Sequence, residues 1–230
     1  IKIGANSLES FDEVFWLSLL NKNYVKKSYL TPHDLSNDQL FEFNKYMQLV
    51  TIKENKKYYL SKNNNNVLRL SSLSEYFSDS LFLVMFRDPL NQANSLMKQN
   101  NLFRESQKHN KFILEYMDMI GHFEFGINRK NVKFDHLSNY KDTEIEYWIE
   151  YWIYLYELVL SKKKGNIEFI CYEELCINAS KYLNYKFQNF KKFQSNFSID
   201  KLLNKNKSVN YFDKKLVDRS YEIYEQLKST

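Results

Sequence analysis

Hydrophobic side chains along this chain follow the helical period in some segments and form short continuous runs in others. Residues 8–20 carry four apolar side chains on one helical face, namely Phe11, Val14, Phe15 and Leu19, a spacing typical of an amphipathic helix. The same period predicts further helices over residues 37–53, 67–77, 147–160 and 213–227. These helices account for much of the chain.

Three shorter runs, over residues 57–61, 80–86 and 166–172, are rich in aromatic and aliphatic side chains and predict strands. The run SLFLVMF at 80–86 is continuous rather than alternating, as expected for a strand covered on both faces. A strand, a helix and a second strand in succession imply parallel pairing through a right-handed crossover. The pattern therefore predicts an α/β fold, with a central parallel sheet flanked by helices on both faces.

The composition fits a globular protein and limits its partners. The 230 residues, 43% hydrophobic and 17% aromatic, predict a single domain over 1–230, and no stretch is apolar enough for a transmembrane helix. The chain begins at Ile1 with no targeting peptide, so we expect a few residues to be missing upstream. The net charge of +5 comes from scattered lysines, a pattern typical of a solvated surface, and nucleic acid is not expected.

Two cysteines, Cys171 and Cys176, are too few for a zinc site of paired cysteines or for a disulfide framework. Free thiols are typical of a reducing compartment. The sequence therefore predicts a cytoplasmic protein without a metal site.

Polar clusters follow each predicted strand, at residues 61–64, 87–89 and 172–174. Open α/β sheets bind ligands at the carboxyl edge of their strands. Asp88 is a residue type that caps helices, and Pro89 is a residue type that occurs at the first helical position, so both have a structural role at a helix start. Arg87 is not explained by that role, because a guanidinium at the end of a buried strand suits a carboxylate or phosphate held by two parallel hydrogen bonds. Ser95, on the second turn of the following helix, offers a hydroxyl to the same anion.

The segment YYLSKNNNNVLRLSSLSEYFSDSLFLVMFRDPLNQANSL, residues 58–96, resembles the middle of sulfotransferases that use 3′-phosphoadenosine 5′-phosphosulfate (PAPS). In that family a strand ends in Arg, and a Ser eight residues later joins it on the 3′-phosphate, as Arg87 and Ser95 are spaced here. Residues 167–187, IEFICYEELCINASKYLNYKF, are similar to a later strand, turn and helix of the family. The resemblance covers most of residues 1–190. It implies a sulfotransferase architecture related to P-loop nucleotide-binding folds, with extra helices.

The resemblance implies a role for several other residues near the donor. Lys62 matches a lysine that lies beside the sulfuryl group in relatives, where it stabilises charge on the leaving oxygen; as a plain sequence feature it is a solvated lysine in an Asn-rich turn. Ser7 and Ser10 match the loop that wraps the 5′-phosphosulfate, although this chain lacks that loop's basic residue and inner glycine. Tyr172 matches a tyrosine near the nucleoside, or else packs at a strand end.

The transfer also needs a base, because the acceptor hydroxyl loses its proton as it attacks sulfur. His33, in YLTPHDL, stands where relatives carry a Glu or His after their second strand. His122, together with Glu124 in GHFEFG, is the other candidate. The resemblance thus implies that PAPS donates a sulfuryl group to a hydroxyl or amine of an unidentified acceptor, such as a glycan, a lipid or a small alcohol, and that 3′-phosphoadenosine 5′-phosphate (PAP) is the product, without a metal.

Two other classes of protein remain open. A P-loop kinase or NTPase would be built on a similar sheet, but the chain has no G-x-x-x-x-G-K-[ST] segment. A non-catalytic carbohydrate-binding or scaffolding protein would keep the fold without the donor loop, and 18 Tyr and 18 Phe would suit stacking on sugars as well as core packing.

Overall fold

The structure is a computed structural model that describes residues 12–134, 139–188 and 207–230. The chain forms two compact units. Unit 1 comprises Ile1–Phe77 and Gln99–Asp135, and unit 2 comprises Ser78–Lys98 and His136–Thr230. Helix α4, Pro89–His109, contributes its first half to unit 2 and its second half to unit 1. Ser7 and Ser10 lie outside the described residues.

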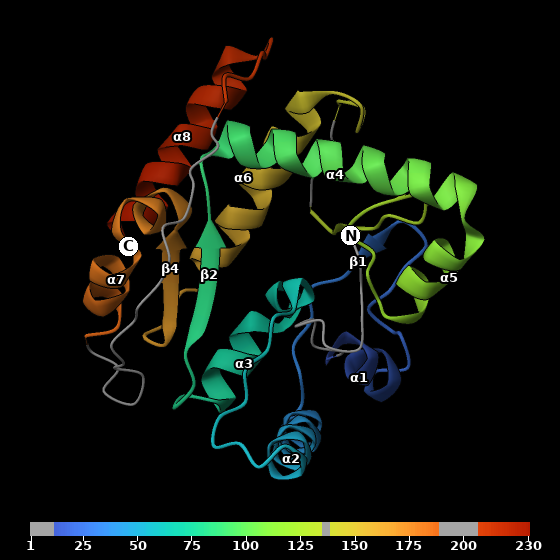
Figure 1. Cartoon of the computed structure of the whole chain (residues 1–230), viewed down its shortest axis with the longest axis vertical. Helices are drawn as coiled ribbons and strands as arrows, with labels where there is room; N and C mark the ends of the chain where they lie inside the picture. The colour runs from blue at the N-terminus through green and yellow to red at the C-terminus, as the bar shows by residue number, and fades with distance from the viewer. Residues whose placement is uncertain (1–11, 135–138, 189–206) are drawn as a thin grey trace. The chain divides into compact units, whose positions relative to one another are not determined.

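Unit 1 is mostly helical (Figure 1). Its elements besides the second half of α4 are α1 (Asp12–Leu19), β1 (Tyr29–Leu30), α2 (Asn37–Lys53), the 3₁₀ helix η1 (Asn64–Arg69), α3 (Leu70–Tyr76), α5 (Lys111–Met119) and β3 (Asn131–Val132). The two short strands β1 and β3 pair in parallel.

Aromatic packing between α1 and α2 forms the core of unit 1. Trp16 is fully buried, and its ring centroid lies 4.5 Å from that of Phe43. Helix α2 begins with a capping box, in which the Ser36 side chain accepts from the Gln39 N–H and the Gln39 side chain accepts from the Ser36 N–H. The helix predicted at 37–53 is confirmed, and the described part of the one at 8–20 is helical too. The helix predicted at 67–77 is observed as the end of η1 followed by α3.

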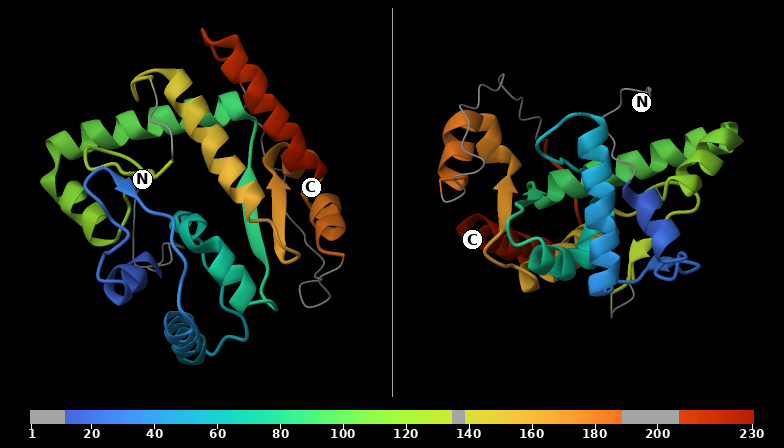
Figure 2. Two further views of the ribbon diagram at one scale, coloured as in Figure 1. Left: turned by 180° about the vertical axis from the view of Figure 1, so that it is seen from behind. Right: turned by 90° about the horizontal axis from the view of Figure 1, so that it is seen from below.

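Unit 2 is built on one pair of parallel strands, β2 (Phe82–Phe86) and β4 (Ile167–Cys171), paired in register from Phe82 with Ile167 to Phe86 with Cys171. The remaining elements are α6 (Ile145–Ser161), α7 (Tyr172–Lys186) and α8 (Lys214–Ser229). Helices α6 and α8 pack together on one face of the strand pair, as the view from behind shows (Figure 2). The predicted strands at 80–86 and 166–172 and their parallel pairing are confirmed.

Strand β2 is less buried than its continuous apolar run predicts. Leu83 and Met85 are each 47% exposed, whereas Ile167, Phe169 and Ile170 of β4 are buried. The prediction of a strand covered on both faces is wrong for β2, because only alternate side chains enter the core. Continuous apolar sequence therefore marks the strand correctly but overstates its burial.

The α/β class is confirmed, but the predicted central sheet is not observed among the described residues. They form two separate sheets of two strands each, β1 with β3 and β2 with β4. Residues 57–61 form no strand. Their side chains anchor the segment instead, because the hydroxyls of Tyr59 and Ser61 both donate to Asp12 of α1. No helix in the described part of the chain has the length and apolar character needed to cross a membrane.

Candidate functional site

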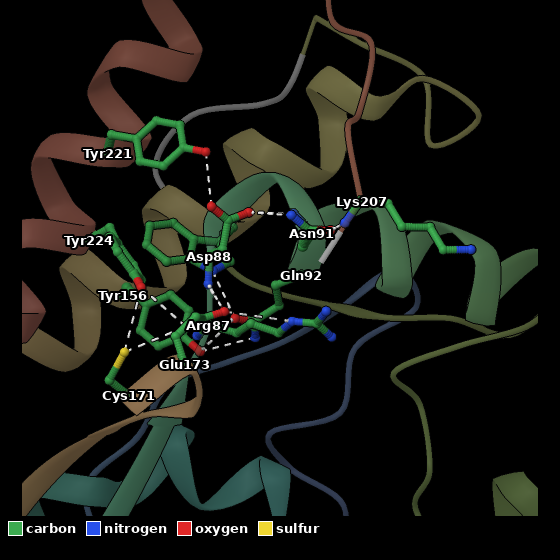
Figure 3. A network of polar contacts seen from close by, with 11 residues as sticks. Arg87, Asp88, Asn91, Gln92, Tyr156, Cys171, Glu173, Lys207, Tyr221 and Tyr224 are labelled. Carbon is green, nitrogen blue, oxygen red and sulfur yellow. Dashed lines mark hydrogen bonds and ion pairs between the residues drawn. The ribbon is translucent and has the colours of Figure 1, made fainter. Parts of the chain in front are cut away.

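Arg87 stands at the carboxyl end of β2 in unit 2, directly beside the residues that follow β4. Because the two strands run parallel and Phe86 pairs with Cys171, the chain positions after them come together. The Arg87 guanidinium carbon lies 5.0 Å from the centroid of the Tyr172 ring, within the range of a cation–π contact. Its Nε lies 3.9 Å from Glu173 Oε1 (Figure 3). Arg87 and Tyr172, which the sequence analysis singled out separately, are therefore in contact.

Glu173 connects the ends of both strands to helix α8. One carboxylate oxygen accepts from the Asp88 N–H at 3.1 Å, and the other accepts from the Tyr224 hydroxyl at 3.1 Å. Burial raises the pKa of the Tyr224 hydroxyl well above its usual value, so this group remains a proton donor. The Cys171 Sγ also lies 3.5 Å from the carboxylate. Glu173 thereby fixes the backbone that carries Arg87, a role that the sequence analysis did not assign.

The start of α4 is fixed by a second set of hydrogen bonds. Asp88 accepts from the Asn91 N–H at 2.9 Å, as an N-terminal cap does, and its other oxygen accepts from Tyr221 at 2.9 Å. Gln92 Oε1 accepts from the Arg87 N–H at 3.1 Å and from the Trp152 indole at 3.0 Å. The predicted roles of Asp88 as a cap and Pro89 as the first helical residue are confirmed.

Ser95 lies on the second turn of α4 in the same unit as Arg87, and its side chain is exposed. The Arg87 side chain is about a quarter exposed. Both groups are therefore accessible from solvent. Their joint binding of one anion stays a prediction.

A small pocket in unit 1 brings together two of the predicted catalytic residues, Lys62 and His122. Its described lining residues all carry polar or charged side chains and are Glu13, Lys62, Asn63, Asn64, Asn65, His122 and Glu124. They come from α1, from the turn that opens η1 and from the loop after α5. The turn is held by Asn63, whose side-chain oxygen accepts from the Asn65 N–H at 2.9 Å.

Glu13 lines this pocket and is paired with a buried arginine. Arg69 Nη2 lies 2.6 Å from Glu13 Oε2, and the two side chains are 0% and 6% exposed. Tyr24 and Asn63 also donate to this carboxylate, Asn63 at 2.9 Å. The guanidinium stacks near Trp16, 4.8 Å from that ring. The charge of Glu13 is thus compensated, and its carboxylate accepts from three side chains.

Glu124 is the second carboxylate of the pocket and has weaker partners. Its Oε1 accepts from Asn64 Nδ2 at 3.4 Å, and its Oε2 lies 4.0 Å from His122 Nδ1. Desolvation raises the pKa of Glu124, against the opposing effects of His122 and Asn64. A carboxyl group beside an imidazole is an arrangement from which either side chain can hydrogen-bond to a small ligand.

His33 lies elsewhere in unit 1, near the backbone of Thr31 and the ring of Tyr24. Its Nδ1 is 2.8 Å from the Thr31 carbonyl oxygen, and its ring centroid is 5.0 Å from that of Tyr24. Burial lowers the pKa of His33, so the neutral form, with Nδ1–H donating to Thr31, is favoured. Its Nε2 is buried. The geometry gives His122 a better position than His33 for contact with a small molecule.

Candidate residues thus occur in both units, with Arg87, Ser95 and Tyr172 in unit 2 and Lys62, His33 and His122 in unit 1. The sequence analysis did not predict the contact between Glu13 and Asn63 in unit 1, or the contacts of Glu173 in unit 2. Across residues 12–134, 139–188 and 207–230, no three His, Cys, Asp or Glu side chains are placed to hold a metal ion. Comparisons with protein-family models, with curated proteins and with solved structures find no match to this chain.

Proposed function

We propose that the protein is a sulfotransferase that moves a sulfuryl group from PAPS to an acceptor hydroxyl. The observation that carries this proposal is the position of Arg87, at the carboxyl end of a parallel strand and 5.0 Å from the ring of Tyr172. Ligands of α/β proteins bind at this edge. An arginine beside an aromatic ring at this edge suits a nucleotide that carries a phosphate on its ribose.

In the proposed complex, Arg87 grips the 3′-phosphate through two of its N–H groups, and Ser95 adds its hydroxyl. Tyr172 packs near the nucleoside. Glu173 holds the Asp88 backbone and lies on the Nε side of Arg87 at 3.9 Å, so the guanidinium is oriented before the donor arrives. Such preorganisation lowers the entropic cost of binding.

In the proposed reaction the acceptor oxygen attacks sulfur, the bond between sulfur and the bridging phosphate oxygen breaks, and PAP leaves. The acceptor passes its proton to a general base. A base at His122 or His33, and a cation at Lys62 beside the bridging oxygen, stay predictions from the resemblance.

The first test is calorimetric titration of the full chain with PAP, AMP and ATP. We expect PAP to bind at least tenfold more tightly than AMP, a difference of about 1.4 kcal/mol or more. Arg87→Ala should erase this preference, and Ser95→Ala should reduce it. Arg87→Lys should recover only part of it, because a lysine cannot form the paired hydrogen bonds of a guanidinium.

Lys98→Ala is the matched control, since Lys98 is an exposed cation on the same helix. It should leave the preference for PAP unchanged. If wild type binds PAP and AMP equally, or if Arg87→Ala and Lys98→Ala lower PAP affinity alike, Arg87 is a structural residue and the proposal is wrong.

A carbohydrate-binding protein without transferase activity is the second candidate. The pocket in unit 1 favours this candidate, because all of its described lining residues carry polar or charged side chains. It predicts sugar binding without any preference for PAP over AMP.

A further inference from the structure

The pocket of unit 1 has a lining that selects for one chemical class of ligand. Each of its described lining residues ends in a carboxylate, an amide, an ammonium or an imidazole group. Pockets for drug-like ligands are instead lined mainly by hydrophobic and aromatic side chains. A phenol, a sterol or a tyrosine side chain has one hydroxyl for several of these groups, and its rings would leave the other polar groups desolvated without hydrogen bonds.

The size of the pocket restricts what enters it. It has room for little more than one or two water-sized groups and opens to solvent. A hydroxyl group fits such a space, whereas an aromatic ring does not. The ligand therefore presents small polar groups to the pocket while the rest of it stays outside.

Two side chains offer a donor and an acceptor next to each other. Asn64 Nδ2 and Glu124 Oε1 are 3.4 Å apart, longer than the usual 2.9–3.0 Å of a good N–H···O bond. A hydroxyl can donate to the carboxylate and accept from the amide at once, because it has one proton and two lone pairs. Two neighbouring hydroxyls can satisfy both groups with shorter bonds than the one they now share.

The charge of the pocket is close to balanced. Arg69 compensates Glu13 at 2.6 Å, which leaves one ammonium, that of Lys62, and one further carboxylate, that of Glu124, among the lining residues. A balanced site has no net attraction for an anionic ligand such as an acidic or already sulfated sugar. Neutral hydroxyl groups fit it best.

We propose that this pocket binds adjacent hydroxyls of a neutral sugar. Asn64 and Glu124 recognise the hydroxyl pair through two side-chain atoms that lie 3.4 Å apart. Sugar binding by this pocket does not depend on the proposed sulfotransferase function.

The test is ligand-observed NMR, by saturation transfer, on the full chain with methyl β-galactoside, methyl β-glucoside and methyl β-N-acetylglucosaminide. The comparison ligands are 4-nitrophenol and tyramine. We expect saturation transfer to at least one sugar and not to the phenols. Asn64→Ala and Glu124→Gln should each weaken the binding of that sugar threefold or more.

Asn101→Ala serves as the matched control, because Asn101 is an exposed amide on α4 outside the pocket lining. It should leave sugar affinity unchanged. The inference is wrong if the phenols bind in preference to all three sugars, if none of the sugars binds, or if the two pocket variants bind sugar as wild type does.

The PAP titration separates the two proposals. Binding of PAP that depends on Arg87, without sugar binding, would support the sulfotransferase and overturn the sugar site. Sugar binding that depends on Asn64 and Glu124, without a preference for PAP, keeps the sugar site and removes the transferase.

Discussion

Arg69 and Glu13 form a buried ion pair in unit 1, and Glu13 also lines the pocket. Replacing Arg69 with Met leaves the Glu13 carboxylate buried without its cation. Removal of one partner of such a pair costs about 3–5 kcal/mol. We expect Arg69→Met to lower the free energy of unfolding by this amount in urea denaturation followed by circular dichroism.

The exposed pair of Lys45 and Glu42 provides the comparison. Its atoms are 2.7 Å apart, but its side chains are 48% and 49% exposed, and exposed pairs contribute about 0–1 kcal/mol. Lys45→Met should therefore change stability by less than about 1 kcal/mol. Equal losses in the two variants would show that the Arg69 pair is not desolvated in the native protein.

His33 links the stability of the protein to pH. Desolvation lowers its pKa from 6.5 in the folded state, while Arg69, Glu13 and Asp34 nearby partly offset one another. The unfolded chain then binds a proton more readily than the folded one as pH falls below about 6.5, so stability decreases in that range. We expect the free energy of unfolding to fall between pH 7 and pH 5.5, and His33→Gln to flatten this part of the curve.

His109→Gln is the control for this measurement, because His109 is exposed at the end of α4. Its stability curve should follow that of wild type. A wild-type slope that survives in His33→Gln would assign the pH dependence to other groups.

At the scale of elements, helix α8 stabilises unit 2 through its apolar face. Val217, Ile223 and Leu227 of this helix are buried, and Ile223 is completely so. Truncation of a buried isoleucine to alanine costs about 2–5 kcal/mol. We expect this loss for Ile223→Ala in chemical denaturation, and a change of less than about 0.5 kcal/mol for Glu225→Ala on the exposed side. A loss below 1 kcal/mol for Ile223→Ala would mean that α8 does not pack as described.

Periodicity predicted most elements because local spacing alone decides which face of a helix or strand can be buried. The helices over 37–53 and 213–227 and the strand over 80–86 follow from it. The segment at 57–61 has the residues of a strand, but hydrogen bonds from Tyr59 and Ser61 to Asp12, 47 and 49 residues away, hold it in an irregular form. Local sequence carries no information about such distant partners.

Part of each candidate site could likewise be predicted from local sequence, and part depends on distant partners. The proximity of Arg87 and Tyr172 could be predicted, because parallel pairing alone brings the ends of two strands together. The contacts of Glu13 at the pocket could not be predicted, because its partners Asn63 and Arg69 are 50 and 56 residues away in the sequence. In the sequence alone, Glu13 looks like one of the acidic residues that are common in the first turn of a helix.

At the scale of the whole molecule, the two units are interleaved along the chain. Residues 78–98 of unit 2 interrupt unit 1, and Gln99–Asp135 of unit 1 interrupt unit 2. Neither unit is therefore a continuous stretch of sequence. Separation of donor-binding and pocket residues by truncation would remove part of each unit, so point variants of the full chain are the appropriate experiments.

The pairing of β2 with β4 has a consequence during synthesis. The strand ends meet where Asp88 donates to Glu173, 85 residues later in the chain. Ribosomes add about 5–20 residues per second, so β2 waits roughly 4–17 s for its partner to be translated. During that interval its apolar run FLVMF is an unpaired edge in the nascent chain. Chaperone occupancy on ribosomes should therefore peak after β2 emerges and decline once β4 has been made.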